Sequence, residues 1–182
     1  GDTAEGLHFG FTLLNILVTI LLFFTAKLFF NSVSGIITAT TYAIVSLTPN
    51  LSGFTIQAEN AVVLFTSVGL LFYAYARKTE KLKYYALMGV AMGMAFMSKT
   101  SGIFMVAAGG LGIITDHFFA EKRKPFKTLF FQASIYSVSA IAISLVFILL
   151  VVLKGSFNEM LFWTIEIPKK YVSTMPWSEG KK

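Results

Sequence analysis

Six long apolar runs, separated by short polar breaks, dominate the sequence and restrict the folds open to this chain. A helix that crosses a membrane needs about 20 apolar residues, with roughly 17 as a lower limit. The pattern predicts membrane helices at residues 7–30, 33–47, 60–76, 84–98, 102–119 and 128–153. Two or three of these runs are near or below that limit. Short spans are typical beside polar cavities or where the bilayer is locally thinned.

Composition agrees with lipid as the main solvent of this protein. Hydrophobic residues make up 55% of the 182 residues and charged residues only 13%, about half the charged fraction of an ordinary soluble domain. A soluble fold of this length could not bury that much apolar surface and still cover itself with polar groups. We therefore predict an all-α, polytopic transmembrane helix bundle over residues 1–153, followed by an outer or luminal segment over residues 154–182.

The formal net charge of +6 does not indicate nucleic acid, because the basic residues cluster in short loops between apolar runs. The chain has no Cys, which excludes disulfides and thiolate metal sites. Asp116 and His117 are adjacent near the end of the fifth run. Neighbouring residues diverge on a helix, so we interpret these two as interfacial polar groups and predict no metal site.

The distribution of Lys and Arg predicts the orientation, since cytoplasmic loops are enriched in basic residues. One set of breaks carries nine of the fifteen: Lys27, Arg77, Lys78, Lys81, Lys83, Lys122, Arg123, Lys124 and Lys127. The tail after residue 153 carries five more lysines, but it is long and terminal and counts less than the short loops. We assign that set to the cytoplasmic side. The style of the loops favours a multi-pass protein of a prokaryotic cytoplasmic membrane. The segment 48–60, the turn at Lys99 and the tail after residue 153 then face outside.

Glu59 and Lys99 are the charged residues of the short outer breaks, and they lie at the ends of different runs. A charge at a membrane boundary is costly unless it is hydrated or paired, which favours a functional site. A plainer interpretation is also open. Glu59 would favour the positive end of a helix dipole, and Lys99 would extend its amine to the lipid headgroups.

Three amides complete the set of candidate polar residues. Gln57 and Asn60 flank Glu59 and could bind sugar hydroxyls. Alternatively, Asn60 caps the third helix and Gln57 is simply solvated. Asn15 lies within the first run, where an amide is expected to hydrogen-bond to a neighbouring helix.

Two stretches give the chain a resemblance to a known family. GVAMGMAFMSKTSG, at residues 89–102, combines a Gly-x-x-x-Gly helix face with a Lys, and SLTPNLSGFTIQAEN, at residues 46–60, carries the outer carboxylate. Their order and sidedness resemble the polyprenyl-phosphate-sugar glycosyltransferases of the GT-C fold, in the protein O-mannosyltransferase and aminoarabinose-transferase-like superfamily. The chain is similar to part of a GT-C module.

The resemblance implies transfer of a sugar from a polyprenyl-phosphate donor to a protein, lipid or glycan acceptor, with no cofactor. Lys99 would bind the donor phosphate, Glu59 would be catalytic, and Gln57 and Asn60 would bind substrate. The family's first outer loop carries an acidic residue that acts toward the acceptor hydroxyl. That loop precedes the point where this sequence begins, so we expect the present chain to be inactive alone.

Two other classes of function remain open on the sequence. The chain could be half of a secondary transporter or lipid flippase, or a non-catalytic membrane subunit. Transporters place their sites near the bilayer midplane between repeated halves. The sequence has no clear internal repeat, and its two isolated charges lie at the outer boundary. Both observations favour chemistry on a lipid headgroup.

Overall fold

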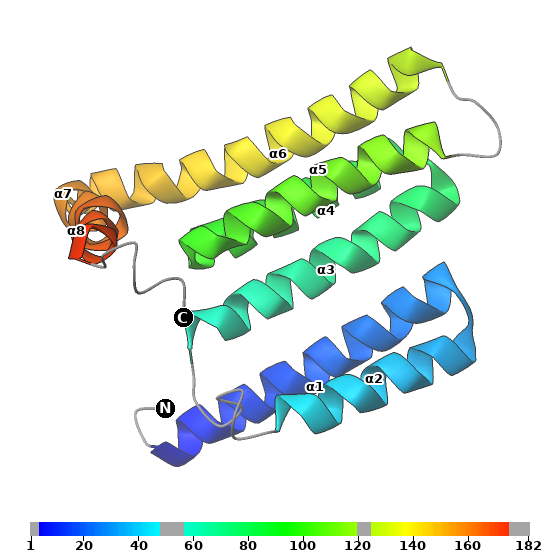
Figure 1. The fold of residues 1–182 in the computed structure, drawn as a ribbon, viewed down its shortest axis with the longest axis horizontal. Coiled ribbons are helices and arrows are strands. Elements are labelled where there is room, and N and C mark those ends of the chain that lie inside the picture. Colours follow the sequence, from blue (N-terminus) through cyan, green and yellow to red (C-terminus); the bar gives the residue numbers. More distant parts are fainter. Residues whose placement is uncertain (1–3, 48–56, 120–124, 175–182) are drawn as a thin grey trace. The chain divides into compact units, whose positions relative to one another are not determined.

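The computed structural model of the chain describes residues 4–47, 57–119 and 125–174. The chain divides into two compact units, Gly1–Ile143 and Ser144–Lys182, and Figure 1 follows the helices along the sequence. Within the described ranges there are helices and turns but no strand. The prediction of an all-helical, polytopic bundle is confirmed.

Each predicted apolar run corresponds to one helix, although several helices extend beyond the predicted bounds. The helices are α1 (Ala4–Phe29), α2 (Ser32–Ser46), α3 (Ala58–Thr79), α4 (Leu82–Ser98), the 3₁₀ turn η2 (Thr100–Gly102), α5 (Ile103–Phe118) and α6 (Phe126–Leu153). The predicted boundary after residue 153 falls at the end of α6, whereas the compact units divide inside this helix. The domain boundary itself stays a prediction.

Short connections make successive helices antiparallel neighbours. α1 and α2 are joined through Asn31, whose Oδ1 accepts a hydrogen bond from the Ser34 backbone N–H at 2.9 Å and so caps α2. α3 ends at Glu80, which has a φ of 56°, and its N–H donates to the Ala76 carbonyl. This left-handed residue reverses the chain into α4.

The first unit is built by α1 packing on α2 and α3, α3 on α4, and α4 on α5 (Figure 1). α6 joins this packing through its first half. A Cβ added at Gly89 of α4 would overlap the Tyr136 carbonyl oxygen, and one at Gly93 would lie 2.7 Å from the Ala140 carbonyl oxygen. Glycine at both positions therefore lets α4 and α6 approach at backbone distance, as the Gly-x-x-x-Gly spacing suggests.

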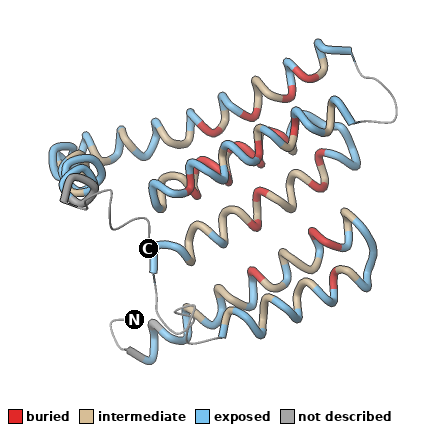
Figure 2. Tube along the Cα trace, in the orientation of Figure 1, coloured by how far each residue is buried: buried red, intermediate tan, exposed pale blue. Residues whose placement is uncertain are grey.

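The buried core lies where the facing sides of α3, α4, α5 and α6 meet, and Figure 2 shows the buried positions along those helices. It is small and formed largely by Ala76, Tyr85, Met88, Met92, Ile113, Leu129 and Tyr136. Many large apolar side chains lie outside it, such as Phe104 at 70% exposed and Val138 at 64%. An exterior this apolar is suited to lipid rather than water.

Four helices are long and apolar enough to cross a membrane: His8–Phe29, Ala58–Thr79, Thr100–Phe118 and Phe126–Leu153. The sequence predicts about six spans. α2 is apolar but has only 15 residues, and α4 has 17. Membrane crossing by α2 and α4 stays a prediction.

The second unit begins inside α6, at Ser144. It contains α7 (Phe157–Leu161), a π-helical turn over Phe162–Glu166 and α8 (Ile167–Thr174). None of the residues of α7 or of the π-helical turn is buried. The part of this unit after residue 153 corresponds to the start of the segment expected outside the membrane, an assignment that stays a prediction.

Candidate functional site

The alternating direction of the helices in the first unit sorts their termini into two groups. The first turns of α1, α3 and α5 lie with the last turns of α2 and α4, and we call this the Glu59 end (Figure 1). The opposite termini form the Arg77 end, where most of the described basic residues of the first unit lie. The two ends differ in chemistry.

At the Glu59 end, the Lys99 ammonium forms an ion pair and hydrogen bond with Oε1 of Glu59. Glu59 lies in the first turn of α3, where the partial positive charge of the helix terminus favours a carboxylate. Lys99 lies between α4 and η2. The side chains remain 49% and 42% exposed, so this pair is open to incoming molecules.

The position of Lys99 is set by the backbone around it. Lys99 is extended, with a φ of −158°, and this residue ends α4. Its carbonyl accepts a hydrogen bond from the Gly102 N–H at 2.8 Å. A Cβ at Gly102 would overlap the Ala95 carbonyl and lie 2.7 Å from the Phe96 Cα. Glycine is therefore needed for the chain to fold back against α4 and hold Lys99 opposite Glu59.

Gln57 and Asn60 flank Glu59 and line a cavity of about 310 Å³ between the first turns of α1 and α3. The remaining lining comes from Gly6, Gly10, Phe11, Leu14 and Ala61. One interpretation of the sequence made Asn60 the cap of α3, and this interpretation is wrong. The helix begins at Ala58, two residues earlier than predicted, so Gln57 occupies the cap position, and its side chain makes no capping bond.

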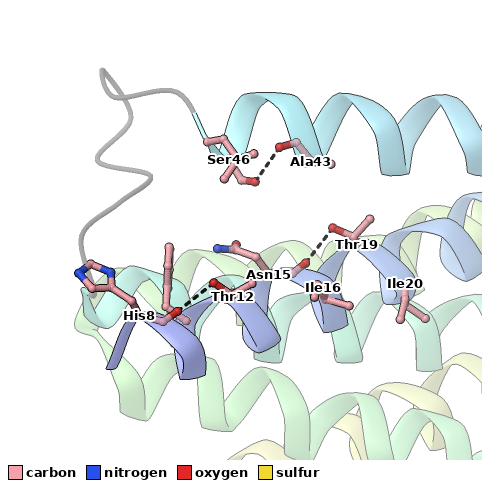
Figure 3. A pocket seen from close by; sticks show the side chains of 10 residues that line it. His8, Thr12, Asn15, Ile16, Thr19, Ile20, Ala43 and Ser46 are labelled. Carbon is pink, nitrogen blue, oxygen red and sulfur yellow. Dashed lines mark hydrogen bonds between the residues drawn. The ribbon is translucent and has the colours of Figure 1, made fainter. Parts of the chain in front are cut away.

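A second cavity, of about 400 Å³, opens between α1 and α2 at the same end (Figure 3). Phe11 lines both cavities. The hydroxyls of Thr12, Thr19 and Ser46 line this one, and each donates to a backbone carbonyl of its own helix. None of the four predicted site residues lines it, and the sequence analysis did not anticipate it.

Asn15 also faces the cavity between α1 and α2 (Figure 3). Its Oδ1 accepts a hydrogen bond from the Tyr42 hydroxyl of α2 at 3.0 Å. The expected hydrogen bond from Asn15 to a neighbouring helix is therefore confirmed. The bond also ties α1 to α2 beside the cavity.

The Arg77 end contains a network that the sequence analysis missed. Arg77 Nε lies 2.9 Å from Oδ2 of Asp116, and the Tyr73 hydroxyl donates to the same oxygen at 2.6 Å. The Arg77 guanidinium carbon also lies 5.3 Å from the centre of the Phe29 ring. The available signal was that Arg77 and Asp116 both occur near the C-terminal ends of runs that cross in the same direction, so both lie on the same side.

His117 does not share in this network. Its ring contacts Phe118 and Phe126, and its buried Nδ1 has no hydrogen-bond partner among the described residues. Asp116 and His117 therefore point to different surroundings, as expected for helix neighbours. Over residues 4–47, 57–119 and 125–174, no three His, Asp or Glu side chains gather in a way that could hold a metal ion.

Of the four residues predicted for the site, the structure brings Glu59 and Lys99 into contact and places Gln57 and Asn60 beside the neighbouring cavity. Their chemical roles stay predictions. Residues 48–56 of the outer loop, the basic residues 122–124 and the tail from residue 175 lie outside the described residues.

A family model for dolichyl-phosphate-mannose-protein mannosyltransferase matches residues 1–153. The matched region contains all of α1 to α6 and both ends of the helix bundle. No curated protein and no solved structure matches the chain.

Proposed function

Since the chain belongs to the dolichyl-phosphate-mannose-protein mannosyltransferase family, a family of GT-C-type membrane glycosyltransferases, we propose that its Glu59 end binds a lipid-phosphate sugar and an acceptor hydroxyl for sugar transfer. The observation that carries this proposal is the contact between Glu59 and Lys99, from separate helices, in an exposed position beside a cavity lined by amides.

Lys99 supplies the charge that the leaving group requires. When the bond between the sugar's anomeric carbon and the donor phosphate breaks, the electron pair stays on the phosphate, and its negative charge grows. An ammonium placed where that charge develops lowers the barrier to bond cleavage. The donor phosphate would replace Glu59 as the partner of Lys99, because both are oxygen anions competing for one exposed cation.

Once Lys99 is engaged by phosphate, the carboxylate of Glu59 is free to accept a hydrogen bond from the acceptor hydroxyl. The acceptor oxygen then bonds to the anomeric carbon, and the proton of the acceptor hydroxyl passes to a carboxylate. Of the described carboxylates at this end, Glu5 and Glu59, only Glu59 contacts the cation proposed to hold the donor. Gln57 and Asn60 offer amide groups to the sugar hydroxyls from the adjacent cavity.

The cavity between α1 and α2 suits the lipid part of the donor. Ile16, Ile20 and Leu47 give it an apolar lining. The hydroxyls of Thr12, Thr19 and Ser46 already donate to backbone carbonyls. An isoprenoid chain that displaces water from beside them therefore leaves no hydroxyl donor without a partner. We extend the proposal to an outward-facing site in a prokaryotic cytoplasmic membrane, which the basic Arg77 end supports under the positive-inside rule.

The test is sugar transfer by the full-length protein reconstituted with a polyprenyl-phosphate mannose and an acceptor peptide. Lys99→Ala is expected to lower transfer by at least about 100-fold, the usual effect of removing a group that stabilises developing charge. It should also weaken donor binding. Glu59→Gln is expected to lower turnover without weakening donor binding, which should tighten because the carboxylate that competes with the phosphate for Lys99 is gone.

Lys83→Ala provides the matched control, because Lys83 lies in the first turn of α4 at the Arg77 end. It should retain wild-type transfer. Full activity in both Lys99→Ala and Glu59→Gln would overturn the proposed site. Movement of the lipid across vesicle membranes without sugar transfer would instead support the flippase alternative.

A further inference from the structure

The Arg77 end contains a third cavity, of about 340 Å³, between the last turns of α1 and α3. It is lined by Leu28, Phe29, Ala74, Arg77 and Lys78. Two of the five lining residues are cations and the other three are apolar. A cavity with cationic groups beside an apolar surface, in a helix bundle surrounded by lipid, matches a ligand that has both an anionic head and a hydrocarbon chain.

Arg77 is held in position before any ligand arrives. Its closest approach to Asp116 is made by Nε, at 2.9 Å. A guanidinium has five N–H donors arranged in a rigid fork, so the two terminal nitrogens remain available to a second acceptor. The centre of the Phe29 ring lies 5.3 Å from the guanidinium carbon. The Tyr73 hydroxyl donates a hydrogen bond of 2.6 Å to Oδ2 of Asp116 and so holds that carboxylate in place. These contacts reduce the entropy lost when an anion binds.

Lys78 supplies the second cation. It is exposed, and within the described part of the chain it makes no ion pair or hydrogen bond. Lys78 and Arg77 are successive residues in the last turn of α3, and both line the cavity. Since Asp116 offsets the charge of Arg77, Lys78 gives the cavity its net positive charge.

We propose that this cavity binds the phosphate of an anionic phospholipid, at the opposite end of the helices from the sugar-transfer site. The terminal nitrogens of Arg77 take two phosphate oxygens, as guanidinium groups commonly do, and the Lys78 ammonium adds a third contact. The first part of an acyl chain lies against Leu28 and Phe29. This phospholipid binding does not depend on any step of the sugar-transfer reaction.

Native mass spectrometry of the full-length protein in detergent tests this site, with phosphatidylglycerol as the anionic probe and phosphatidylcholine as the zwitterionic one. Phosphatidylglycerol is expected to bind at least tenfold more tightly. Lys78→Gln should weaken that binding about tenfold, the usual effect of losing one charge-assisted hydrogen bond. Arg77→Lys should weaken it because an ammonium cannot form the two-pronged contact.

Lys83→Gln is the matched control, since it removes a cation from the same end of the bundle but not from the cavity lining. It should bind phosphatidylglycerol like the wild type. Equal weakening in Lys83→Gln and Lys78→Gln would overturn the site in favour of diffuse surface charge. Equal binding of the two lipids, or full displacement of phosphatidylglycerol by millimolar inorganic phosphate, would overturn the lipid assignment. Among the described residues the Lys78 side chain makes no hydrogen bond or ion pair, so its variant decides the result even where Arg77→Lys is unstable.

Discussion

The two ends of the helix bundle each contain an ion pair between helices, but the pairs have different surroundings. At the Glu59 end, both partners are nearly half exposed, and neither has a second side-chain partner among the described residues. At the Arg77 end, Asp116 is only 29% exposed and also accepts a hydrogen bond from Tyr73. The first pair can exchange partners with little loss of other contacts, whereas breaking the second disturbs several.

This difference separates an ion pair that can exchange partners from one that helps to hold the helices together. Exposed ion pairs contribute little to stability because water screens them and two flexible side chains must be ordered. The Arg77 network joins α3 to α5 and, through Phe29, to α1. We therefore expect changes to the Glu59–Lys99 pair to alter activity at constant stability, and changes to the Arg77–Asp116 network to alter stability first.

The largest expected effect comes from exchanging the two charges at the Glu59 end. In the double variant Glu59→Lys with Lys99→Glu, an ion pair can form again, so the unfolding temperature in detergent should remain close to wild type. Transfer activity should fall by at least about 100-fold, because the cation has moved away from the donor phosphate. Retained transfer in this variant would show that only the presence of the pair matters, not the position of its charges.

Asp116→Asn should reverse that result at the other end. The amide that replaces the carboxylate carries no charge to hold Arg77, and it accepts a weaker hydrogen bond from the Tyr73 hydroxyl. Because Asp116 is partly exposed, we expect a loss of about 2 kcal/mol in the free energy of unfolding, in the range measured for hydrogen bonds to charged groups. Thermal unfolding in detergent followed by far-ultraviolet circular dichroism measures this. Transfer by the protein that remains folded should be unchanged, and a selective loss of activity would contradict the division between the ends.

Gly102→Ala tests whether packing sets the position of Lys99, and a smaller effect is expected. The added methyl group overlaps the Ala95 carbonyl, so the turn must move and carry Lys99 away from Glu59. We expect a roughly tenfold loss of transfer, equivalent to ~1.4 kcal/mol of transition-state stabilisation.

Gly110→Ala is the control for Gly102→Ala. A Cβ at Gly110 would lie 3.8 Å from the Tyr136 ring, an ordinary contact. This variant should keep both its stability and its activity. A loss of transfer equal to that of Gly102→Ala would mean that the α4–α5 region is sensitive to any added methyl group, rather than to displacement of Lys99.

The sequence predicted the fold well because lipid imposes a simple rule on apolar runs. Backbone groups in hydrocarbon must be paired within the segment, so each run becomes a helix and each polar break a turn. The contact between Glu59 and Lys99 also followed in part from topology. Antiparallel helices joined by short turns bring the start of α3 and the end of α4 to one end.

Other features depended on packing that no local pattern encodes. Asp116 was interpreted as an interfacial group, because its partners Arg77 and Tyr73 lie about 40 residues away and meet it only after α3 and α5 pack. The cavities are gaps left where helices diverge, so their lining depends on the relative rotation of α1, α2 and α3. Hydrophobic periodicity does not fix that rotation when all faces of a helix are apolar.

The shortness of α2 has a consequence for how a lipid reaches the protein. Its 15 residues rise about 22 Å at 1.5 Å per residue, whereas bilayer hydrocarbon is about 30 Å thick. Because α2 is predicted to cross the membrane, acyl chains beside it would have to compress, or the headgroup layer would have to dip toward the helix termini. Ser46 and Leu47, at one terminus, line the cavity shared with α1. A lipid headgroup that enters the cavity at that point would cross a thinner layer of hydrocarbon than anywhere else around α1 and α2.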